Sequence, residues 1–336
     1  MSEVVVLSVT EVAHLAQKAL VAHGARPESA ASLAHAIAAA ERDGISSHGL
    51  AYLPIYCEHL TCGKVDGSAV PTLRIASPSV VIVDAAAGFA HPAIDLGLGT
   101  LCPLAEKQGV AALAIYNSYN CGALGYHTER IAERKLVGLG FTNAPASIAP
   151  WGAVKPVLGT NPWSFAVPSA EAKPLFVIDQ SASVVAKSEV MKRARAGQAI
   201  PPGWAFDASG RPTTDPQAAL KGTMAPAGGY KGVGSALLVE VMAACLTGAT
   251  PGAVASAFSG TQGGPPRTGQ FFIAFAPGTT SEGRFFECLA IVQKSFVTQA
   301  GGRLPGSRRI AAREQADREG VRVQRDLHER ICALFN

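Results

Sequence analysis

The sequence has few charged residues, few aromatic residues and no long apolar run free of charge. Charged residues make up 16% and aromatic residues 7% of the 336 positions, and 29 basic against 25 acidic residues leave a net charge of +4. With 48% hydrophobic residues the chain is not a charge-driven disordered one, and so small a charge predicts no nucleic-acid partner. The longest apolar stretch, 235–249, contains Glu240 and is too short to span a membrane. The first residues include acids where a signal peptide would have basic residues, so no secretion signal is expected.

The cysteines form no pair with metal-binding or redox spacing. Seven cysteines are dispersed along the chain, and no two have the spacing of a C-x-x-C motif. The sequence therefore predicts neither a zinc site nor a redox pair, and no metal is expected. An odd number of scattered cysteines is typical of reduced thiols, which predicts a cytoplasmic protein.

The best-known catalytic and nucleotide-binding motifs are also absent. No G-x-G-x-x-G follows a predicted strand, since Gly229, Gly232 and Gly234 have a different spacing and lie at the start of a helix. There is no Walker loop, no G-x-S-x-G elbow and no H-E-x-x-H helix. These absences count against an ordinary Rossmann enzyme, a P-loop nucleotidase, an α/β-hydrolase and a zinc protease.

The residues that are present predict alternating helices and strands, and hence an α/β fold. Ser8 and Glu11 have the spacing of a capping box. Helices are expected at 8–22, 27–40, 47–60, 91–108, 125–135 and, buried, at 230–246. Strands are expected at 80–83, 110–115, 136–142, 175–178 and 271–275. An ordered excursion is expected over 197–228, and amphipathic pieces near 281–296, 308–318 and 324–335.

One of the eight histidines lies in a segment that is built like a site. His48 follows Ser47 and precedes Gly49, in a polar stretch between two predicted helices. A serine can orient an imidazole, and a glycine lets a ligand approach the backbone closely. The residues alone leave a catalytic and a structural role for His48 both open.

Two further segments have features of a cofactor site. Residues 117–125 follow the strand at 110–115 and open a helix, and such a turn of small residues offers free N–H groups to a phosphate. An ordinary glycine-rich turn is the alternative. Arg303, Arg308 and Arg309 surround a Pro-Gly turn and suit a phosphate or a carboxylate. The alternative for these three arginines is a solvated basic loop.

Eight short motifs follow one another along nearly the whole chain. They are DGISSHG at 43–49, APWG at 149–152, PVLGTNP at 156–162, GWA at 203–205, PTTDP at 212–216, GGYKG at 228–232, TGQ at 268–270 and RLPG at 303–306. In this order they resemble the malate/L-lactate dehydrogenase-like NAD(P)-dependent oxidoreductases. That family includes sulfolactate dehydrogenases and the Δ1-piperideine-2-carboxylate and Δ1-pyrroline-2-carboxylate reductases.

The resemblance implies a fold and a set of site residues. The fold is a non-Rossmann dinucleotide-binding α/β fold with a largely antiparallel or mixed sheet and a helical N-terminal region, usually in an intertwined homodimer. His48 is implied to be the proton donor, with Ser47 as its relay and Glu189 as a candidate partner of that relay. Thr160 matches a substrate contact. The implied cofactor contacts are Asn120, Cys121, Gly122, Ala123, Leu124, Asp179, Gln180, Ser181, Tyr230, Lys231, Arg303, Leu304, Pro305, Gly306, Ser307, Arg308 and Arg309.

Two positions depart from the family pattern. An arginine that commonly clamps the substrate carboxylate, four residues after the motif histidine, is Tyr52 here. A histidine often present in the cofactor turn is Asn120. We expect Tyr52 either to line the substrate side or to pack in a helix away from it. If it lines the site, another cation binds the carboxylate, for which Lys231 and Arg267 are candidates, or the substrate has a bulkier, less polar body.

The resemblance and the residues together predict hydride transfer between a nicotinamide cofactor and a small carboxylate. The expected substrate is a 2-oxoacid or 2-hydroxyacid such as malate, lactate or 3-sulfolactate, with His48 as acid/base. The alternatives are a cyclic imine reductase acting on Δ1-piperideine-2-carboxylate or Δ1-pyrroline-2-carboxylate, and a non-catalytic protein that kept the fold. NADP(H) is expected to be preferred over NAD(H), because the three arginines exceed what a pyrophosphate requires. Residues 1–70 with 290–336 are expected to form a helical, substrate-side and dimer region, and 71–289 the dinucleotide-binding and catalytic core.

Overall fold

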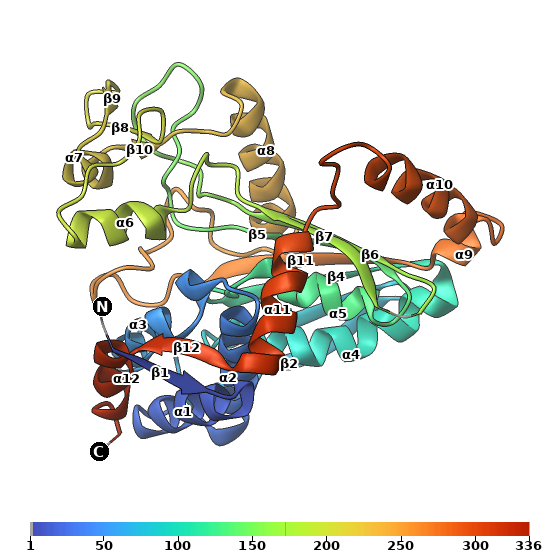
Figure 1. Cartoon of the computed structure of the whole chain (residues 1–336), viewed down its shortest axis with the longest axis horizontal. Helices are drawn as coiled ribbons and strands as arrows, with labels where there is room; N and C mark the ends of the chain where they lie inside the picture. Colours follow the sequence, from blue (N-terminus) through green and yellow to red (C-terminus); the bar gives the residue numbers. More distant parts are fainter. Residues whose placement is uncertain (1–2, 172, 336) are drawn as a thin grey trace.

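The computed structural model describes residues 3–171 and 173–335, and its centre is a seven-stranded sheet (Figure 1). The strands lie in the order β2–β3–β4–β11–β5–β6–β7. Their bounds are β2 Thr72–Ser77, β3 Val80–Asp84, β4 Val110–Ser118, β5 Val137–Thr142, β6 Trp163–Pro168, β7 Pro174–Gln180 and β11 Thr268–Phe275. Neighbouring strands are antiparallel except β3 and β4, which are parallel. The predicted α/β fold with a largely antiparallel or mixed sheet is confirmed.

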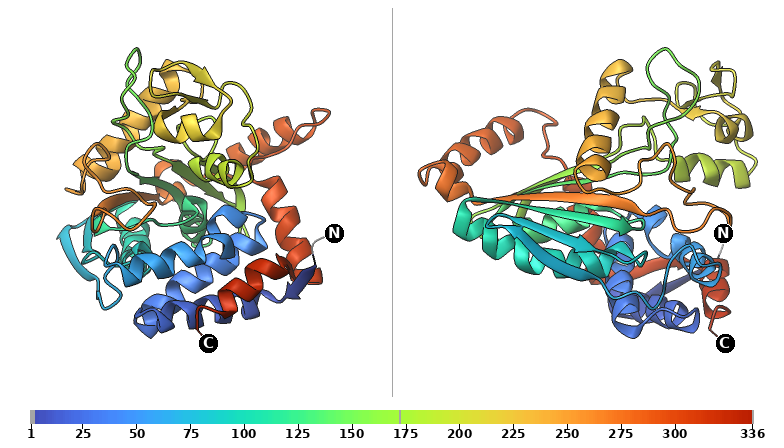
Figure 2. Two further views of the ribbon diagram at one scale, coloured as in Figure 1. Left: turned by 90° about the vertical axis from the view of Figure 1, so that its left-hand side faces the viewer. Right: turned by 180° about the vertical axis from the view of Figure 1, so that it is seen from behind.

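Helices cover both faces of this sheet (Figures 1 and 2). On one face lie α4 (Ala90–Gln108) and α5 (Leu124–Ala132), and on the other lies α8 (Tyr230–Glu240), continued by a π-helical turn at Val241–Cys245. The core between α4 and the sheet includes Leu98, Leu113 and Phe272. Gly97 lets α4 approach closely, because a Cβ at this position would lie 2.5 Å from the side chain of Leu113.

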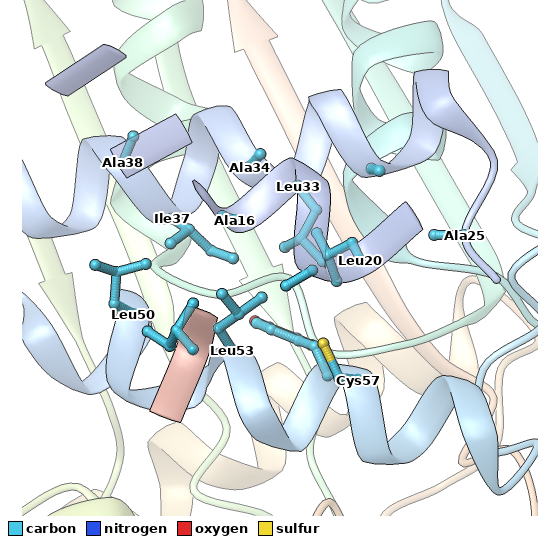
Figure 3. Close-up of a cluster of buried hydrophobic side chains, with 14 of the residues drawn as sticks. Ala16, Leu20, Ala25, Leu33, Ala34, Ile37, Ala38, Leu50, Leu53 and Cys57 are labelled. Carbon is cyan, nitrogen blue, oxygen red and sulfur yellow. The ribbon is translucent and has the colours of Figure 1, made fainter. Parts of the chain in front are cut away.

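The N-terminal helices form a separate layer with its own core (Figure 3). This layer contains α1 (Val9–Ala22), α2 (Pro27–Arg42), 3₁₀ turns at Ser46–His48 and Leu50–Tyr52, and α3 (Leu53–Thr61). The predicted capping box begins α1, since the Ser8 hydroxyl accepts from the Glu11 amide and the Glu11 carboxylate accepts from the Ser8 amide. Leu20, Leu33 and Leu53 are fully buried where the helices meet. Each contributes about 1.5–3 kcal/mol of burial free energy.

Both ends of the chain join this helical layer. Strand β1 (Val4–Leu7) pairs antiparallel with β12 (Val321–Gln324), and α12 (Arg325–Cys332) packs on α1. Helix α11 (Ser307–Glu319) crosses back from the sheet to α2. Arg313 of α11 forms ion pairs with Asp43, at 2.8 Å, and with Glu129, at 2.5 Å. The C-terminal segment therefore links the helical layer to α5 beneath the sheet.

A small outer lobe and a projecting arm complete the molecule (Figure 1). The lobe contains α6 (Lys187–Arg195), α7 (Pro216–Lys221) and a three-stranded sheet of β8 (Ala205–Phe206), β9 (Pro212–Thr213) and β10 (Thr223–Met224). Ile148, Val190 and Ile200 belong to its buried core. The excursion predicted at 197–228 is thus an ordered part of this lobe. The arm contains α9 (Pro277–Thr280) and α10 (Phe285–Val297), and it lies at the far end of the sheet from the N-terminal helices.

The structure differs from the sequence-based expectation in two helices. The helix predicted at 47–60 begins only at Leu53, after two 3₁₀ turns. Gly49 lies between these turns, and its backbone angles are not helical. The helix predicted as buried at 230–246 exposes one apolar face, where Leu237 and Leu238 are more than half exposed. The short strands β1, β2, β6 and β12 were not predicted. None of the helices within the described ranges is long and apolar enough to cross a membrane.

Candidate active site

A cavity of about 510 Å³ is lined by residues of the helical layer, the sheet and the outer lobe. Its volume lies within the range of small-molecule sites, roughly 300–1,000 Å³. Many of the predicted site residues meet in its wall. They are Ser47, His48, Tyr52, Asn120, Cys121, Gly122, Ala123, Leu124, Thr160, Asp179, Gln180, Ser181 and Arg309. These residues come from segments far apart in the sequence, so only the fold brings them together.

His48 lies in the first 3₁₀ turn, and its half-buried imidazole lines the cavity. Nδ1 is buried and has no hydrogen-bond partner among the described residues. Burial lowers the pKa of His48 below its ordinary value, and the negative charge of Asp179 acts in the opposite direction. An imidazole with a lowered pKa releases its proton readily, as a general acid must.

Glu41 of α2 fixes the turn that carries His48. The carboxylate of this half-buried residue accepts from the amide of Leu50 at 2.7 Å, two residues beyond His48. Desolvation raises the pKa of Glu41, and the Leu50 hydrogen bond acts in the opposite direction. A side chain at Gly49 would overlap this carboxylate. The glycine after His48 is therefore required by the close approach of Glu41, which the sequence pattern did not reveal.

Asp179 and Arg309 form the charged wall of the cavity. The Asp179 carboxylate lies 3.4 Å from the Arg309 guanidinium and accepts from the Gly125 amide at 2.8 Å. Gly125 is in the first turn of α5, and a Cβ there would lie 2.6 Å from Arg309. Within the turn, Asn120 accepts from the Gly122 amide at 2.7 Å. Two amides that we expected to face a phosphate are thus bound within the protein.

A lysine that was not predicted also lines the cavity. Lys187 begins α6, and the ammonium of this half-buried residue donates to the hydroxyl of Ser147 at 3.3 Å. Desolvation lowers its pKa. Among the described residues it has no carboxylate partner within salt-bridge distance, whereas Arg309 is paired with Asp179. The tract around Lys187 reads as an ordinary polar helix start, so no sequence signal distinguishes it.

Thr160 is held in the wall by a buried amide and carboxylate network that was also not predicted. Asn161, at φ +38°, donates to Glu240 at 2.7 Å and accepts from the Ala144 amide at 3.1 Å. Glu240 in turn accepts from the Gly252 amide at 2.6 Å. The only sequence signal was an acidic residue within the apolar helix pattern. Glu240 is buried because it joins the wall to α8.

Other predicted residues lie outside the cavity lining. The Glu189 carboxylate pairs with Arg193 of its own helix at 3.3 Å. Tyr230 is 62% exposed and contacts the ring of Trp151, and Lys231 is exposed beside it. Arg267, the other candidate cation, is also exposed.

The C-terminal loop approaches the cavity only at its end. Leu304, Pro305, Gly306 and Ser307 lead into α11 beside β7, where a Cβ on Gly306 would lie 3.1 Å from the carbonyl oxygen of Val177. Arg303 and Arg308 are exposed and do not line the cavity, unlike Arg309. Within the described ranges, no group of three metal-ligating side chains is placed to hold a metal ion.

The fold and the site define an α/β protein whose cavity combines an imidazole with a cation that has no acidic partner among the described residues. Comparison with known proteins gives the class. Residues 7–332 match the model of the malate/L-lactate dehydrogenase family, and the chain belongs to this family. The prediction from the eight motifs, and with it the predicted NAD(P)-dependent oxidoreductase class, is confirmed.

Relatives and solved structures match over nearly the whole chain. The (2R)-3-sulfolactate dehydrogenase (NADP(+)) of Chromohalobacter salexigens is 44% identical over 92% of this chain and 92% of its own. The Δ1-pyrroline-2-carboxylate/Δ1-piperideine-2-carboxylate reductase of Pseudomonas putida is 41% identical over 96% of this chain and 94% of its own. The crystal structure of Δ1-piperideine-2-carboxylate reductase from Pseudomonas syringae pvar. tomato has a TM-score of 0.91 and 36% identity, and the match covers 98% of this chain and 99% of that one.

Proposed function

We propose that this protein is an NADP(H)-dependent oxidoreductase that transfers a hydride to or from the carbon of a C=O or C=N bond beside a carboxylate. The observation that carries the proposal is one cavity containing both His48 and the half-buried Lys187, which has no carboxylate partner among the described residues. An acid/base group and a cation are what reduction of such a substrate requires of the protein. The relatives named above act on substrates of this kind.

The protein's own groups position the substrate and move one proton. When NADPH is bound, it supplies the hydride. In the reductive direction His48 donates its proton to the oxygen or nitrogen of the bond being reduced, and in the oxidative direction it accepts that proton. Ser47, beside His48 in the cavity wall, is proposed to orient the imidazole. Thr160 is proposed to contact the substrate from the opposite segment of the wall.

The cavity wall also suits the nicotinamide end of a dinucleotide. Gly122 has a φ of +66°, and the turn it belongs to presents backbone atoms and small side chains to the cavity. Asp179, Gln180 and Ser181 are proposed to contact the cofactor from the end of β7, with Arg309 beside them. The charged pair at Asp179 and Arg309 offers one acceptor and several donors to the polar groups of the cofactor.

The pairing of charges favours a substrate with a single negative group. Lys187 is the cation free to bind it among the described lining residues, because Arg309 is engaged by Asp179. Ile45, Ile55 and Met191 add apolar surface to the same wall. This apolar surface and Tyr52 favour a cyclic imine carboxylate, the alternative substrate, over a dianion such as malate. Assays with pyruvate, oxaloacetate, 3-sulfopyruvate and the two cyclic imines test the proposal, and no turnover of any of them would refute it.

Replacing Lys187 with methionine is expected to raise KM for the carboxylate substrate about 10- to 100-fold, since a hydrogen bond to a charged group contributes about 1.5–3 kcal/mol. Methionine keeps the length of the side chain and removes the charge. The exposed Lys192 of the same helix provides the control, and Lys192→Met should leave KM unchanged. Steady-state kinetics with saturating NADPH measures both. Equal KM values for Lys187→Met and the parent would exclude Lys187 as the carboxylate ligand.

NADPH is expected to have a lower KM than NADH, because Arg303 and Arg308 are exposed in the segment that leads to Arg309 of the cavity wall and suit a 2′-phosphate. The double variant Arg303→Ala, Arg308→Ala should raise the KM for NADPH about 5- to 10-fold, below the full value of a charged hydrogen bond because both groups are solvated. The KM for NADH is the internal control and should not change. Equal use of the two cofactors by the parent protein would contradict this assignment.

The projecting arm supports a homodimer. Helix α10 has no buried residue, and Ile291, Val292 and Phe296 are between 49% and 63% exposed. We propose that a second copy covers this apolar face and that the helical region of 1–70 and 290–336 and the core of 71–289 act together in the dimer. A monomeric mass in light scattering would refute this.

The seven cysteines are all free, which supports a reducing, cytoplasmic location.

A further inference from the structure

One wall of the cavity is a loop with no helix or strand of its own. Residues 256–264 form this loop, here called the strap, and Ala257, Phe258 and Ser259 line the cavity. The Ser256 hydroxyl donates to the carbonyl oxygen of Gly264 at 2.6 Å and closes the strap on itself. A loop without secondary structure keeps a defined position only when other groups bind its backbone.

Three side chains of the helical layer bind carbonyl oxygens of the strap. The Lys64 ammonium donates to Ala257 at 2.6 Å, and the Tyr52 hydroxyl donates to Phe258 at 3.2 Å. Nε2 of His59 lies 3.0 Å from the carbonyl oxygen of Gly260 and donates to it. The strap is therefore held near its start, at Ala257 and Phe258, and at its centre, at Gly260, in each case by a side chain of the segment 52–64.

The Lys64 ammonium is an unusual group to bind a loop carbonyl. Its side chain is fully buried, and the carbonyl oxygen of Ala257 is its one hydrogen-bond partner among the described residues. A buried cation without a carboxylate partner costs stability, since it gives up its hydration for a single neutral acceptor. Burial accordingly lowers its pKa, while Cys62 and Glu58 act in the opposite direction. If the side chain at this position only filled space, the protein would be less stable with lysine there than with methionine or leucine.

The strap is also connected to the opposite wall through aromatic rings. The Phe258 ring meets the ring of Tyr119 edge-on, with 5.4 Å between the centroids. The Tyr119 hydroxyl is hydrogen-bonded to Nδ1 of His59, so His59 joins the strap and Tyr119. Tyr119 directly precedes Asn120, at the start of the turn that lines the cavity. Through Tyr119, the strap therefore contacts the segment that continues into the turn on the cofactor side.

We propose that Lys64 is a positioning residue that holds the strap over the substrate side of the cavity, and that the strap limits which substrate bodies fit. The inference rests on the proposed function only for its effect on KM. The hydroxyl of Tyr52 is occupied by Phe258, so Tyr52 binds the strap and presents its ring, not its hydroxyl, to the substrate. The substrate body then contacts the Phe258 ring and the strap backbone, and substrates of another width are excluded.

The test replaces Lys64 with methionine in the full chain. We expect cleavage by chymotrypsin after Phe258 to become at least about tenfold faster, because the strap opens more readily once one charged hydrogen bond is lost. KM for the preferred substrate should rise about tenfold while kcat stays within about threefold, and the preference among substrates of different width should narrow. Lys221→Met, at an exposed lysine of α7, is the control and should change none of these values.

The outcomes separate the strap from the proposed function. Cleavage after Phe258 at the parent rate overturns the proposal, and so does a loss of kcat with KM and the cleavage rate unchanged. Faster cleavage in a protein that reduces none of the tested carboxylates supports the strap and refutes the function instead. Should Lys64→Met fail to fold, Tyr52→Phe keeps the ring and removes only the bond to Phe258. It should accelerate chymotrypsin cleavage after Phe258, and an unchanged cleavage rate overturns the proposal.

Discussion

Replacing His48 with alanine is expected to lower kcat by about 10²- to 10⁴-fold, the usual contribution of a positioned general acid. The imidazole lines the cavity, and an imidazole is the side chain whose ordinary pKa lies nearest to neutral pH. NADPH binding, measured by fluorescence titration, should be retained because His48 is not placed among the cofactor contacts. His35→Ala, at an exposed position of α2, is the control and should leave kcat unchanged. A variant with near-parent kcat would show that another group supplies the proton.

The pH dependence gives an independent check on His48. Burial lowers the pKa of His48, so in the free enzyme the imidazole loses its proton at a pH below the ordinary pKa of histidine. Reduction requires the protonated form, and kcat/KM for reduction should therefore be highest at low pH and fall as pH rises through this lowered pKa. Oxidation requires the neutral form and should show the opposite slope. Identical slopes in both directions would contradict the assignment.

Replacing Arg313 with methionine is expected to destabilise the protein by about 3 kcal/mol. The guanidinium binds both Asp43 and Glu129, whose side chains are only 8% and 7% exposed. Removing it leaves two buried carboxylates without a partner, and breaking such a pair costs about 3–5 kcal/mol. The lower end applies because the Arg313 side chain is itself 21% exposed.

Activity should fall with stability in this variant, since α11 also carries Arg309 into the cavity wall. Urea unfolding monitored by circular dichroism measures the free energy of unfolding. Arg318→Met, on the exposed side of the same helix, is the matched control and should stay within about 0.5 kcal/mol of the parent. A similar loss in both variants would indicate that helix α11, and not the ion pairs, sets the stability.

The local elements were predictable because their signals are local. The capping box at Ser8 and the apolar periodicity placed α1 and α2, and β-branched runs placed β3 and β4. Strands β1 and β12 were missed because four-residue strands at opposite ends of the chain are recognisable only once they pair. The helix predicted at 47–60 was placed too early because periodicity does not register a carboxylate that arrives from α2.

The candidate site was only partly predictable, and the reason is charge pairing. A motif identifies which residue types recur, and it led to His48, the turn at 120–124 and Asp179. A motif does not show which cation is already paired with a carboxylate. Lys231, Arg267 and Lys187 are equivalent in the sequence, and burial distinguishes Lys187 from the two exposed ones. The sequence likewise does not show that the Glu189 carboxylate lies beside Arg193, one helical turn away.

The sequence by itself determined the family, the α/β fold and the histidine that serves as the candidate acid, because motifs and periodicity are properties of neighbouring residues. Only the tertiary structure decided which charges are free and which residues close the cavity. Lys64 reads as one lysine after a helix, and Phe258 as one residue of a glycine-rich loop. Their relation exists because the fold brings residues almost 200 positions apart within 2.6 Å and removes the water that would otherwise separate them.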